Sequence, residues 1–142
     1  MKKIVECNAG DYSALVGIWE RSVRSTHNFL SKEDLLEIRR ALIPEYFPAV
    51  DLFGLSDDNI LRALIGLSLN KIEMLFVDAD YRGLGYGSDL VQFAVDHGVS
   101  LVDVNEQNTS ALRFYIANGF NIMNRDDVDN AGRPFPILHL TL

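Results

Sequence analysis

The sequence has one cysteine, four prolines and no long hydrophobic run. The single cysteine, Cys7, cannot form an internal disulfide and excludes a zinc site built from cysteines, so we favour a structural role for it over a catalytic thiol. With 48% hydrophobic and 23% charged residues, the composition excludes a fibrous or disordered chain. No apolar stretch approaches the roughly 20 residues of a membrane span, and the N-terminal MKKIVECNAGDY lacks the apolar segment of a secretory signal. We therefore expect a cytoplasmic protein that has no membrane partner.

Positive charge is also scarce. Thirteen Lys and Arg residues stand against 20 Asp and Glu residues, which gives a net charge of −7. Nucleic-acid binding depends on neutralising phosphates with Lys and Arg, so we expect no nucleic-acid partner, and a cationic amine suits this charge better. The length fits one domain, and no repeat or linker divides the chain, so we expect a single domain over 1–142.

The apolar periodicity predicts a mixed α+β fold with one parallel pair of strands, since strand, helix and strand follow one another within about thirty residues after position 71. Within 60–69, alternate residues from Leu61 to Leu69 are expected on one face. The expected strands are 4–5, 50–55, 60–69, 71–77, 100–104, one that begins at Gly119-Phe120, and 136–142. The expected helices are one capped by Asp11 that carries Leu15, Ile18, Trp19 and Val23, one over 32–42 capped by Ser31 and ended by Pro44 and Pro48, one that carries Leu90, Phe93, Ala94 and His97, and one from Asn108 to Asn118.

The segment DYRGLGYGSD, residues 80–89, places Gly83, Gly85 and Gly87 between an apolar run and a helical pattern. Glycine permits positive φ and close approach of a ligand to the backbone, and a helix N-terminus attracts anions. Arg82 adds a side chain that can bind phosphate oxygens in pairs. The segment predicts an anion site; the simpler alternative is a tight turn that needs glycine only for packing.

Two common phosphate-binding loops fit this segment less well. A nucleoside-triphosphate loop ends in Gly-Lys-Ser/Thr, whereas Gly87 is followed by Ser88-Asp89. A dinucleotide-binding loop needs a third glycine where Ser88 stands, although Asp103, some twenty residues further on, keeps this alternative open. An oxidoreductase that binds NAD is therefore a third reading of the chain.

Two ordered motifs resemble the GNAT superfamily of N-acetyltransferases. Residues 82–87 match its R/Q-x-x-G-x-G/A motif, and residues 108–120 are similar to its N-x-x-A-x-x-x-Y-x-x-x-G-F segment. Residues 24–30 and 104–108 resemble a bacterial branch of the family, while Ala79 stands where many relatives carry proline. The resemblance implies a GNAT-like, mostly antiparallel twisted sheet of about seven strands, with the fourth and fifth strands parallel, and about four helices.

The resemblance also implies acetyl-CoA as co-substrate and no metal. In the family the pyrophosphate rests on the glycine loop, and the pantetheine arm lies along the fourth strand and contacts an asparagine. Asn108 matches that asparagine, which is compatible with a second role as a helix cap. The expected cofactor-binding residues are Leu75, Phe76, Val77, Arg82, Gly83, Leu84, Gly85, Tyr86, Gly87, Ser88, Asn105, Asn108 and Tyr115.

The implied reaction is direct attack of a primary amine on the acetyl carbonyl, without a covalent intermediate. Tyr115 matches the family's tyrosine that protonates the departing thiolate; alternatively it only packs against its neighbours. A free alkylamine has a pKa of about 10, so a carboxylate is needed to take its proton, and Glu73 and Asp103 are the candidates, unless both are merely solvated strand residues. His27 is a candidate substrate-binding residue or a surface histidine.

The sequence does not identify the acceptor, which is either a small molecule or a peptide amine, and it is equally compatible with a monomer and a homodimer. A catalytically idle acyl-CoA-binding sensor is the alternative to an enzyme. We expect His97 to lie in the core or at the C-terminal end of a helix, and no partner for His139 is visible in the sequence. The acidic run 126–130 lacks the spacing of a calcium loop and is expected to be a solvated loop.

Overall fold

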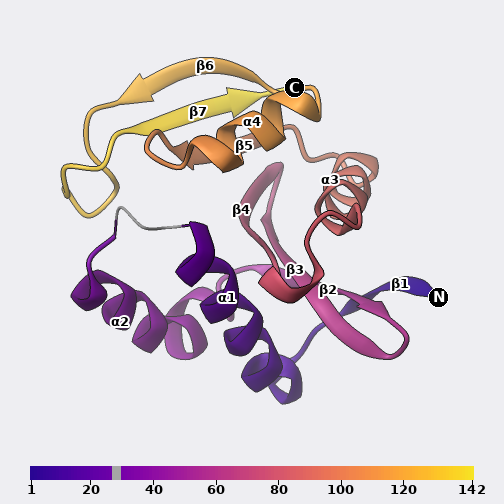
Figure 1. Ribbon diagram of the computed structural model, residues 1–142. Coiled ribbons are helices and arrows are strands. Elements are labelled where there is room, and N and C mark those ends of the chain that lie inside the picture. Colours follow the sequence, from indigo (N-terminus) through magenta and orange to yellow (C-terminus); the bar gives the residue numbers. More distant parts are fainter. Residues whose placement is uncertain (27–29) are drawn as a thin grey trace.

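The protein is described here by a computed structural model, which covers residues 1–26 and 30–142 (Figure 1). In these residues seven strands form one sheet in the order β1-β2-β3-β4-β5-β7-β6, and β4 and β5 are its only parallel neighbours. The strands are β1 (Lys2–Glu6), β2 (Asp51–Asp57), β3 (Ile60–Ser68), β4 (Lys71–Val77), β5 (Leu101–Asn105), β6 (Asn121–Asp126) and β7 (Ile137–Thr141). The helices are α1 (Tyr12–Thr26), α2 (Lys32–Ala41), α3 (Tyr86–Asp96) and α4 (Thr109–Ala117). The expected fold class is confirmed.

Two apolar clusters cover the two faces of the sheet. One lies under α3 and α4 and includes Ala63 and Ile65 of β3, whereas the other lies under α1 and α2 and includes Leu64. Because successive strand residues point to opposite faces, β3 contributes to both clusters. Figure 1 shows the sheet as two halves, with β1–β4 below and β5–β7 above. No helix in the described part of the chain has the length and apolarity to cross a bilayer.

Bulges interrupt the meander at two places that matter for the site. Leu55 and Ser56 of β2 pair with Ala63 and Leu61 of β3, which leaves Arg62 as the extra residue in β3. The predicted single face from Leu61 to Leu69 is therefore wrong: Leu61 packs in the cluster under α1, and Leu69 lies in an exposed turn. An inserted residue reverses the alternation of side chains on the strand.

The second bulge separates the two parallel strands. Opposite β3, Leu67 pairs with Ile72 and Gly66 with Met74, so that Glu73 is the extra residue in β4. The ladder between β4 and β5 then holds only two residue pairs, the last of them Ile72 with Val102. Because a bulge bends and twists its strand, β4 diverges from β5 beyond this point.

Helix boundaries follow the predicted signals with two corrections. Asp11 is not the cap of α1: the Asn8 side chain accepts from Gly10 N–H, Asp11 accepts from Asn8 N–H in a capping box, and a short 3₁₀ turn (Ala9–Asp11) leads into the helix. Ser31 caps α2, as predicted, by accepting from the backbone N–H of Asp34. Pro44 does not end this helical stretch. It lies inside a π-type turn (Leu42–Tyr46) closed by a hydrogen bond from Phe47 N–H to Leu42 O, which needs no donor from proline.

Candidate functional site

A cavity of about 400 Å³ lies where β4 diverges from β5, between the glycine loop, α4 and the end of α1. Every expected cofactor-binding residue except Asn105 lines it. The motif search did not predict five further lining residues, which come from α1, from the loop before the glycines and from α4: Ser22, Tyr81, Ser110, Ala111 and Phe114. The cavity therefore joins segments more than ninety residues apart in the sequence.

The three glycines are needed for two different reasons. Gly83 and Gly85 have φ of +76° and +83°, and a Cβ added at either would meet nothing within 4 Å, so backbone conformation alone requires glycine there. A Cβ on Gly87 would lie 3.1 Å from the Phe114 ring, so this glycine allows α3 to pack closely on α4. Packing therefore explains one glycine and leaves two that shape an open loop.

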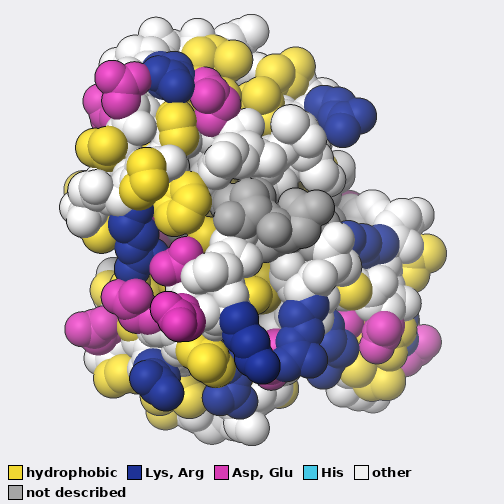
Figure 2. Space-filling model, turned by 60° about the vertical axis from the view of Figure 1, so that its left-hand side comes forward, with side chains coloured by type: hydrophobic (Ala, Val, Ile, Leu, Met, Phe, Trp, Pro, Cys, Tyr) yellow, Lys and Arg dark blue, Asp and Glu magenta, His cyan; other side chains and the backbone are white. Residues whose placement is uncertain are grey.

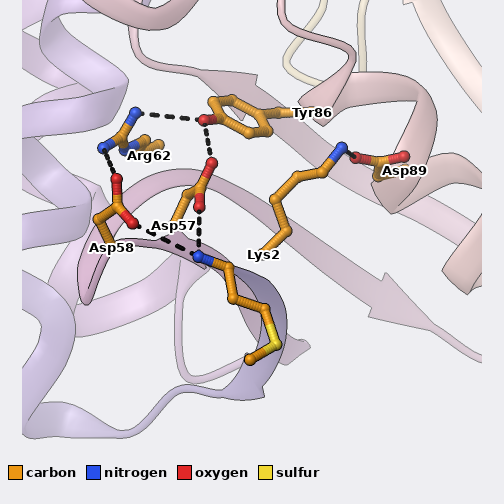
Figure 3. A network of polar contacts seen from close by, with 7 residues as sticks. Lys2, Asp57, Asp58, Arg62, Tyr86 and Asp89 are labelled. Carbon is orange, nitrogen blue, oxygen red and sulfur yellow. Dashed lines mark hydrogen bonds and ion pairs between the residues drawn. The ribbon is translucent and has the colours of Figure 1, made fainter.

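Helix α3 begins at this loop with its first N–H groups uncapped by any side chain, since Gly85 is the capping residue. The first N–H groups of a helix have no intrahelical acceptor and carry a partial positive charge. The acidic residue of this turn, Asp89, forms an ion pair with Lys2 at 2.9 Å, which offsets its negative charge (Figure 3). Arg82 donates to the carbonyl of Ser22 at 3.2 Å, so the loop is tied to α1 and remains suited to an anion.

An ion pair fixes the junction between β4 and the loop. Arg21 of α1 donates from Nε to both carboxylate oxygens of Asp78, each at 3.0 Å, and from a terminal nitrogen at 2.7 Å. Asp78 is 3% exposed and also accepts from Asp80 N–H. Burial raises the pKa of Asp78, but the hydrogen bonds from Arg21, the N–H of Asp80 and the positive charge of Arg21 together outweigh it, so the pKa lies below its ordinary value. The carboxylate is therefore ionised and anchors the loop to α1.

A polar network lies behind the loop (Figure 3). The bulge residue Arg62 donates to the hydroxyl of Tyr86 at 3.2 Å, and that hydroxyl donates to Asp57 at 2.8 Å. The Arg62 guanidinium also lies 4.2 Å from the ring centroid of Tyr81. Both tyrosines line the cavity, so the bulge directs Arg62 to support its wall. Sequence reasoning missed Arg62, because its contacts cross the sheet.

Tyr115 lies in the wall of the cavity and is 6% exposed. Its ring makes edge contacts with Phe114 and Phe120, at centroid distances of 5.1 and 5.7 Å. Its hydroxyl has no hydrogen-bond partner among the described residues, and burial raises the pKa of the phenol. The group therefore stays protonated at neutral pH and is able to donate to a ligand.

The two predicted asparagines differ in place. Asn108 lines the cavity and caps α4 by accepting from Ala111 N–H at 3.1 Å, so its expected role as a cap is confirmed. Asn105 instead accepts from Gln107 N–H at 2.9 Å in the turn after β5, and it is absent from the described lining. Both asparagines were predicted to bind the cofactor, but of the two only Asn108 lines the cavity.

Neither candidate base belongs to the described lining of the cavity. Glu73 is exposed in the bulge of β4 and has no ion pair within the described ranges. Asp103 contacts Lys71 and also His139, whose Nδ1 lies 2.6 Å from its carboxylate, while Nε2 of the histidine lies 2.7 Å from Asp126. His139, for which no partner was visible in the sequence, therefore has two, because strand pairing aligns it with both carboxylates.

The remaining candidates lie elsewhere. His27 falls outside the described residues, and His97 caps the C-terminal end of α3, as expected. Cys7 is half-buried, does not line the cavity, and burial raises the pKa of its thiol to about 11, which fits a structural residue. No group of three or more potential metal ligands occurs in residues 1–26 and 30–142.

Comparison with known proteins identifies the family. Residues 52–122 match the model of the acetyltransferase (GNAT) domain. The chain is 38% identical over 128 residues to the peptidyl-lysine N-acetyltransferase YjaB of Salmonella typhimurium, covering 89% of this chain and 88% of the relative, and equally identical to the Escherichia coli protein of that name, covering 86% of it. The chain belongs to the GNAT acetyltransferase family. This membership confirms the resemblance, including that to the YjaB-like branch, and it shows that the chain is an acetyltransferase.

The fold of this GNAT enzyme is shared with solved structures. The apo form of YjaB from Escherichia coli superposes with a TM-score of 0.91 at 34% identity, covering 99% of this chain and 97% of the other. PaiA N-acetyltransferase from Thermoplasma acidophilum, solved in complex with coenzyme A, gives a TM-score of 0.72 at 19% identity over 100% and 99% of the two chains. The second likeness shows the fold alone. The NAD-dependent alternative has no support from these relatives.

Proposed function

We propose that this GNAT enzyme transfers the acetyl group of acetyl-CoA to a primary amine, with a lysine side chain of a peptide or protein as the acceptor. The names of the YjaB relatives support the choice of acceptor. The observation that carries the cofactor proposal is the cavity in which the glycine loop, the diverging end of β4 and the side chain of Tyr115 meet.

The residues present fit the chemistry of acetyl-CoA. Anionic pyrophosphate oxygens suit Arg82 and the N–H groups that open α3, and the space beside Gly83 and Gly85 admits them without steric conflict. The pantetheine arm, which carries amides, suits the backbone of residues 75–77 and the side chain of Asn108, all of which line the same cavity. A cofactor bound in this way extends from the glycine loop toward Tyr115 within the same cavity.

The proposed transfer is a direct displacement. The amine nitrogen forms a bond to the acetyl carbon while the carbon–sulfur bond breaks, and backbone N–H groups of the segment Phe76–Val77 stabilise the carbonyl oxygen. The Tyr115 hydroxyl gives its proton to the departing thiolate. Because a thiolate with a conjugate-acid pKa of about 8.5 leaves more readily when a phenol donates to it, this donation speeds the reaction.

The amine must lose a proton, and Glu73 is our candidate for the group that receives it, through a water molecule. Its carboxylate is exposed, no described cation pairs with it, and it lies two residues before the wall formed by Leu75. Asp103 is the weaker candidate, since Lys71 and His139 both contact its carboxylate. We therefore expect Glu73→Gln to reduce kcat more than Asp103→Asn.

Replacement of Tyr115 by phenylalanine tests the proposal. Because its hydroxyl has no described partner, removing it leaves no buried group unsatisfied and should preserve folding. We expect Tyr115→Phe to bind acetyl-CoA in calorimetry as the wild type does, while the release of CoA thiol with a lysine peptide falls by about 10²- to 10⁴-fold. Failure of the wild type to bind millimolar acetyl-CoA would overturn the cofactor proposal, and full activity of the variant would overturn the role of Tyr115.

A further inference from the structure

A second cavity, of about 380 Å³, lies between α1 and α2 and is separate from the acetyl-transfer site. We call it the α1–α2 groove. Four of its lining residues come from α1 and four from α2: Trp19, Glu20, Val23 and Arg24, and Lys32, Leu35, Leu36 and Arg39. In Figure 2, Lys and Arg side chains gather in the lower half of the visible face, at the height of these helices.

The floor of the groove is apolar. Trp19 and Val23 are buried, whereas Leu36 is 42% exposed although it lies in the same lining. An exposed leucine beside a buried aromatic ring gives the groove a surface on which an apolar side chain of a ligand gains by leaving water. Trp19 is also the only tryptophan of the chain and lines the groove, so its fluorescence can report on a ligand that binds there.

The rim is cationic in a protein of net charge −7. Glu20 is the only acidic residue of the described lining, and two arginines share it: Arg24 at 2.7 Å and Arg39 at 3.6 Å. Lys32 forms no ion pair with any described residue. Three cations against one carboxylate leave an excess of two positive charges around an apolar floor, which selects a ligand that is both apolar and anionic.

We propose that the α1–α2 groove binds an acidic segment of the acceptor protein, with an apolar side chain on Trp19 and Leu36 and with Asp or Glu side chains on the rim. That this segment belongs to the acceptor rests on the proposed function, whereas its binding to the groove does not. Helix α1 connects the two sites, since Ser22 lines the acetyl-transfer cavity and its neighbour Val23 lines the groove.

This arrangement sets a spacing between the acidic residues and the target lysine. A helix with its side chains is roughly 10–12 Å across, and an extended chain advances about 3.3 Å per residue. A peptide that passes across α1 therefore places its acidic residues about three or four positions from the lysine whose amine enters the cavity.

Binding is tested without catalysis by titrating Trp19 fluorescence. The probe is the lysine-free peptide N-acetyl-Glu-Leu-Glu-Glu amide, and its control is the Gln-Leu-Gln-Gln isostere. We expect saturable binding of the acidic peptide, at least about fivefold tighter than the isostere. The double variant Arg24→Gln/Lys32→Gln should weaken binding by about five- to thirtyfold, as two exposed charge contacts are lost.

A matched control removes the same charge elsewhere. Lys3 and Arg113 are exposed and line neither cavity, so Lys3→Gln/Arg113→Gln should leave the affinity unchanged. Circular dichroism of both double variants checks that they are folded. Equal affinity for the two peptides, an equal loss in both double variants, or binding of an oligothymidylate in place of the acidic peptide would each overturn the inference.

A kinetic experiment separates this inference from the proposed function. Lysine peptides of equal length carry Glu-Leu, Gln-Leu or Lys-Leu four positions from the target lysine, and kcat/KM is measured from thiol release. We expect the acidic peptide to be the best substrate, with the difference lost in Arg24→Gln/Lys32→Gln. Equal kcat/KM for the three peptides would overturn the inference that the groove binds an acidic segment and would leave the proposed function intact. Binding of the acidic peptide without acetylation of any peptide would overturn only the proposal that the acceptor is a peptide.

Discussion

The ion pair between Arg21 and Asp78 offers the sharpest test of how the acetyl-transfer cavity is held. Arg21→Gln removes three hydrogen bonds of 2.7 to 3.0 Å from a carboxylate that is 3% exposed. What remains to Asp78 among the described side-chain contacts is the single N–H of Asp80. The variant therefore leaves a buried negative charge without its counterion.

The expected cost lies between two reference cases. Breaking a fully buried pair costs about 3–5 kcal/mol, and an exposed pair contributes about 0–1 kcal/mol. The side chain of Arg21 is 48% exposed, whereas that of Asp78 is buried, so we expect Arg21→Gln to lower the free energy of unfolding by about 2 kcal/mol. For a chain of 142 residues, with an unfolding entropy of about 2.1 cal/mol/K per residue, this corresponds to a fall in Tm of about 7 °C.

The deficit should depend on pH. In the wild type the pKa of Asp78 lies below the ordinary value of 3.8, so the stabilisation is present above that pH and is lost as the pH falls through the folded-state pKa. In the variant, burial without Arg21 raises the pKa of Asp78 above its ordinary value, so protonation relieves the penalty as the pH falls toward about 4. The stability difference should therefore be largest at neutral pH and shrink in mild acid.

Urea denaturation at pH 7 and pH 4.5 measures both effects. The control is Arg24→Gln on the same helix, because Arg24 is 72% exposed and its pair with Glu20 should contribute no more than about 0.5 kcal/mol. A deficit for Arg21→Gln as small as that of the control, or one of equal size at both pH values, would refute the reasoning.

Three further changes test other parts of the site. Gly85→Ala should lower the free energy of unfolding by about 1–2 kcal/mol through its positive φ alone, which urea denaturation measures, and calorimetry should show weaker acetyl-CoA binding. Hydrogen bonds to Asp126 and, to a smaller extent, to Asp103 raise the pKa of His139. The free energy of unfolding that the wild type gains over His139→Gln should therefore be at its full value below about pH 6.5 and should decline by up to about 1 kcal/mol as the pH rises, which denaturation curves across that range measure. Arg62→Met should raise KM for acetyl-CoA about five- to tenfold with kcat unchanged in steady-state assays, because it removes support from the cavity wall and touches no reacting atom.

The sequence predicted the conformation of the glycine loop and its place beside a helix N-terminus well because both are local. Residues 82–88 are contiguous, and the φ angles of Gly83 and Gly85 and the helix that follows depend on neighbours within a few positions. Each of these residues lines the cavity. The segment 108–115 was predicted for the same reason, since the cap and the tyrosine lie on one short helix.

The surroundings of the β5 residues were predicted less well because the contacts of a strand residue depend on strand pairing. Asn105 and Asp103 lie on β5, where Gln107, Lys71 and His139 occupy their polar groups. The partners of His139 are 36 and 13 positions away, and Arg21 is 57 positions away from Asp78. Such contacts arise from sheet register and helix docking, which a single sequence does not reveal.

The two bulges explain why simple alternation fails beside the site. Ile72 and Leu75 both face the cluster under α3 and α4, although a regular strand would turn residues three apart to opposite faces, and the insertion of Glu73 accounts for the change. The same insertion separates β4 from β5 and makes room for the cavity, while the insertion of Arg62 supports the opposite wall through Tyr86. These two irregular positions therefore help to build the site, and strand periodicity is uninformative at both of them.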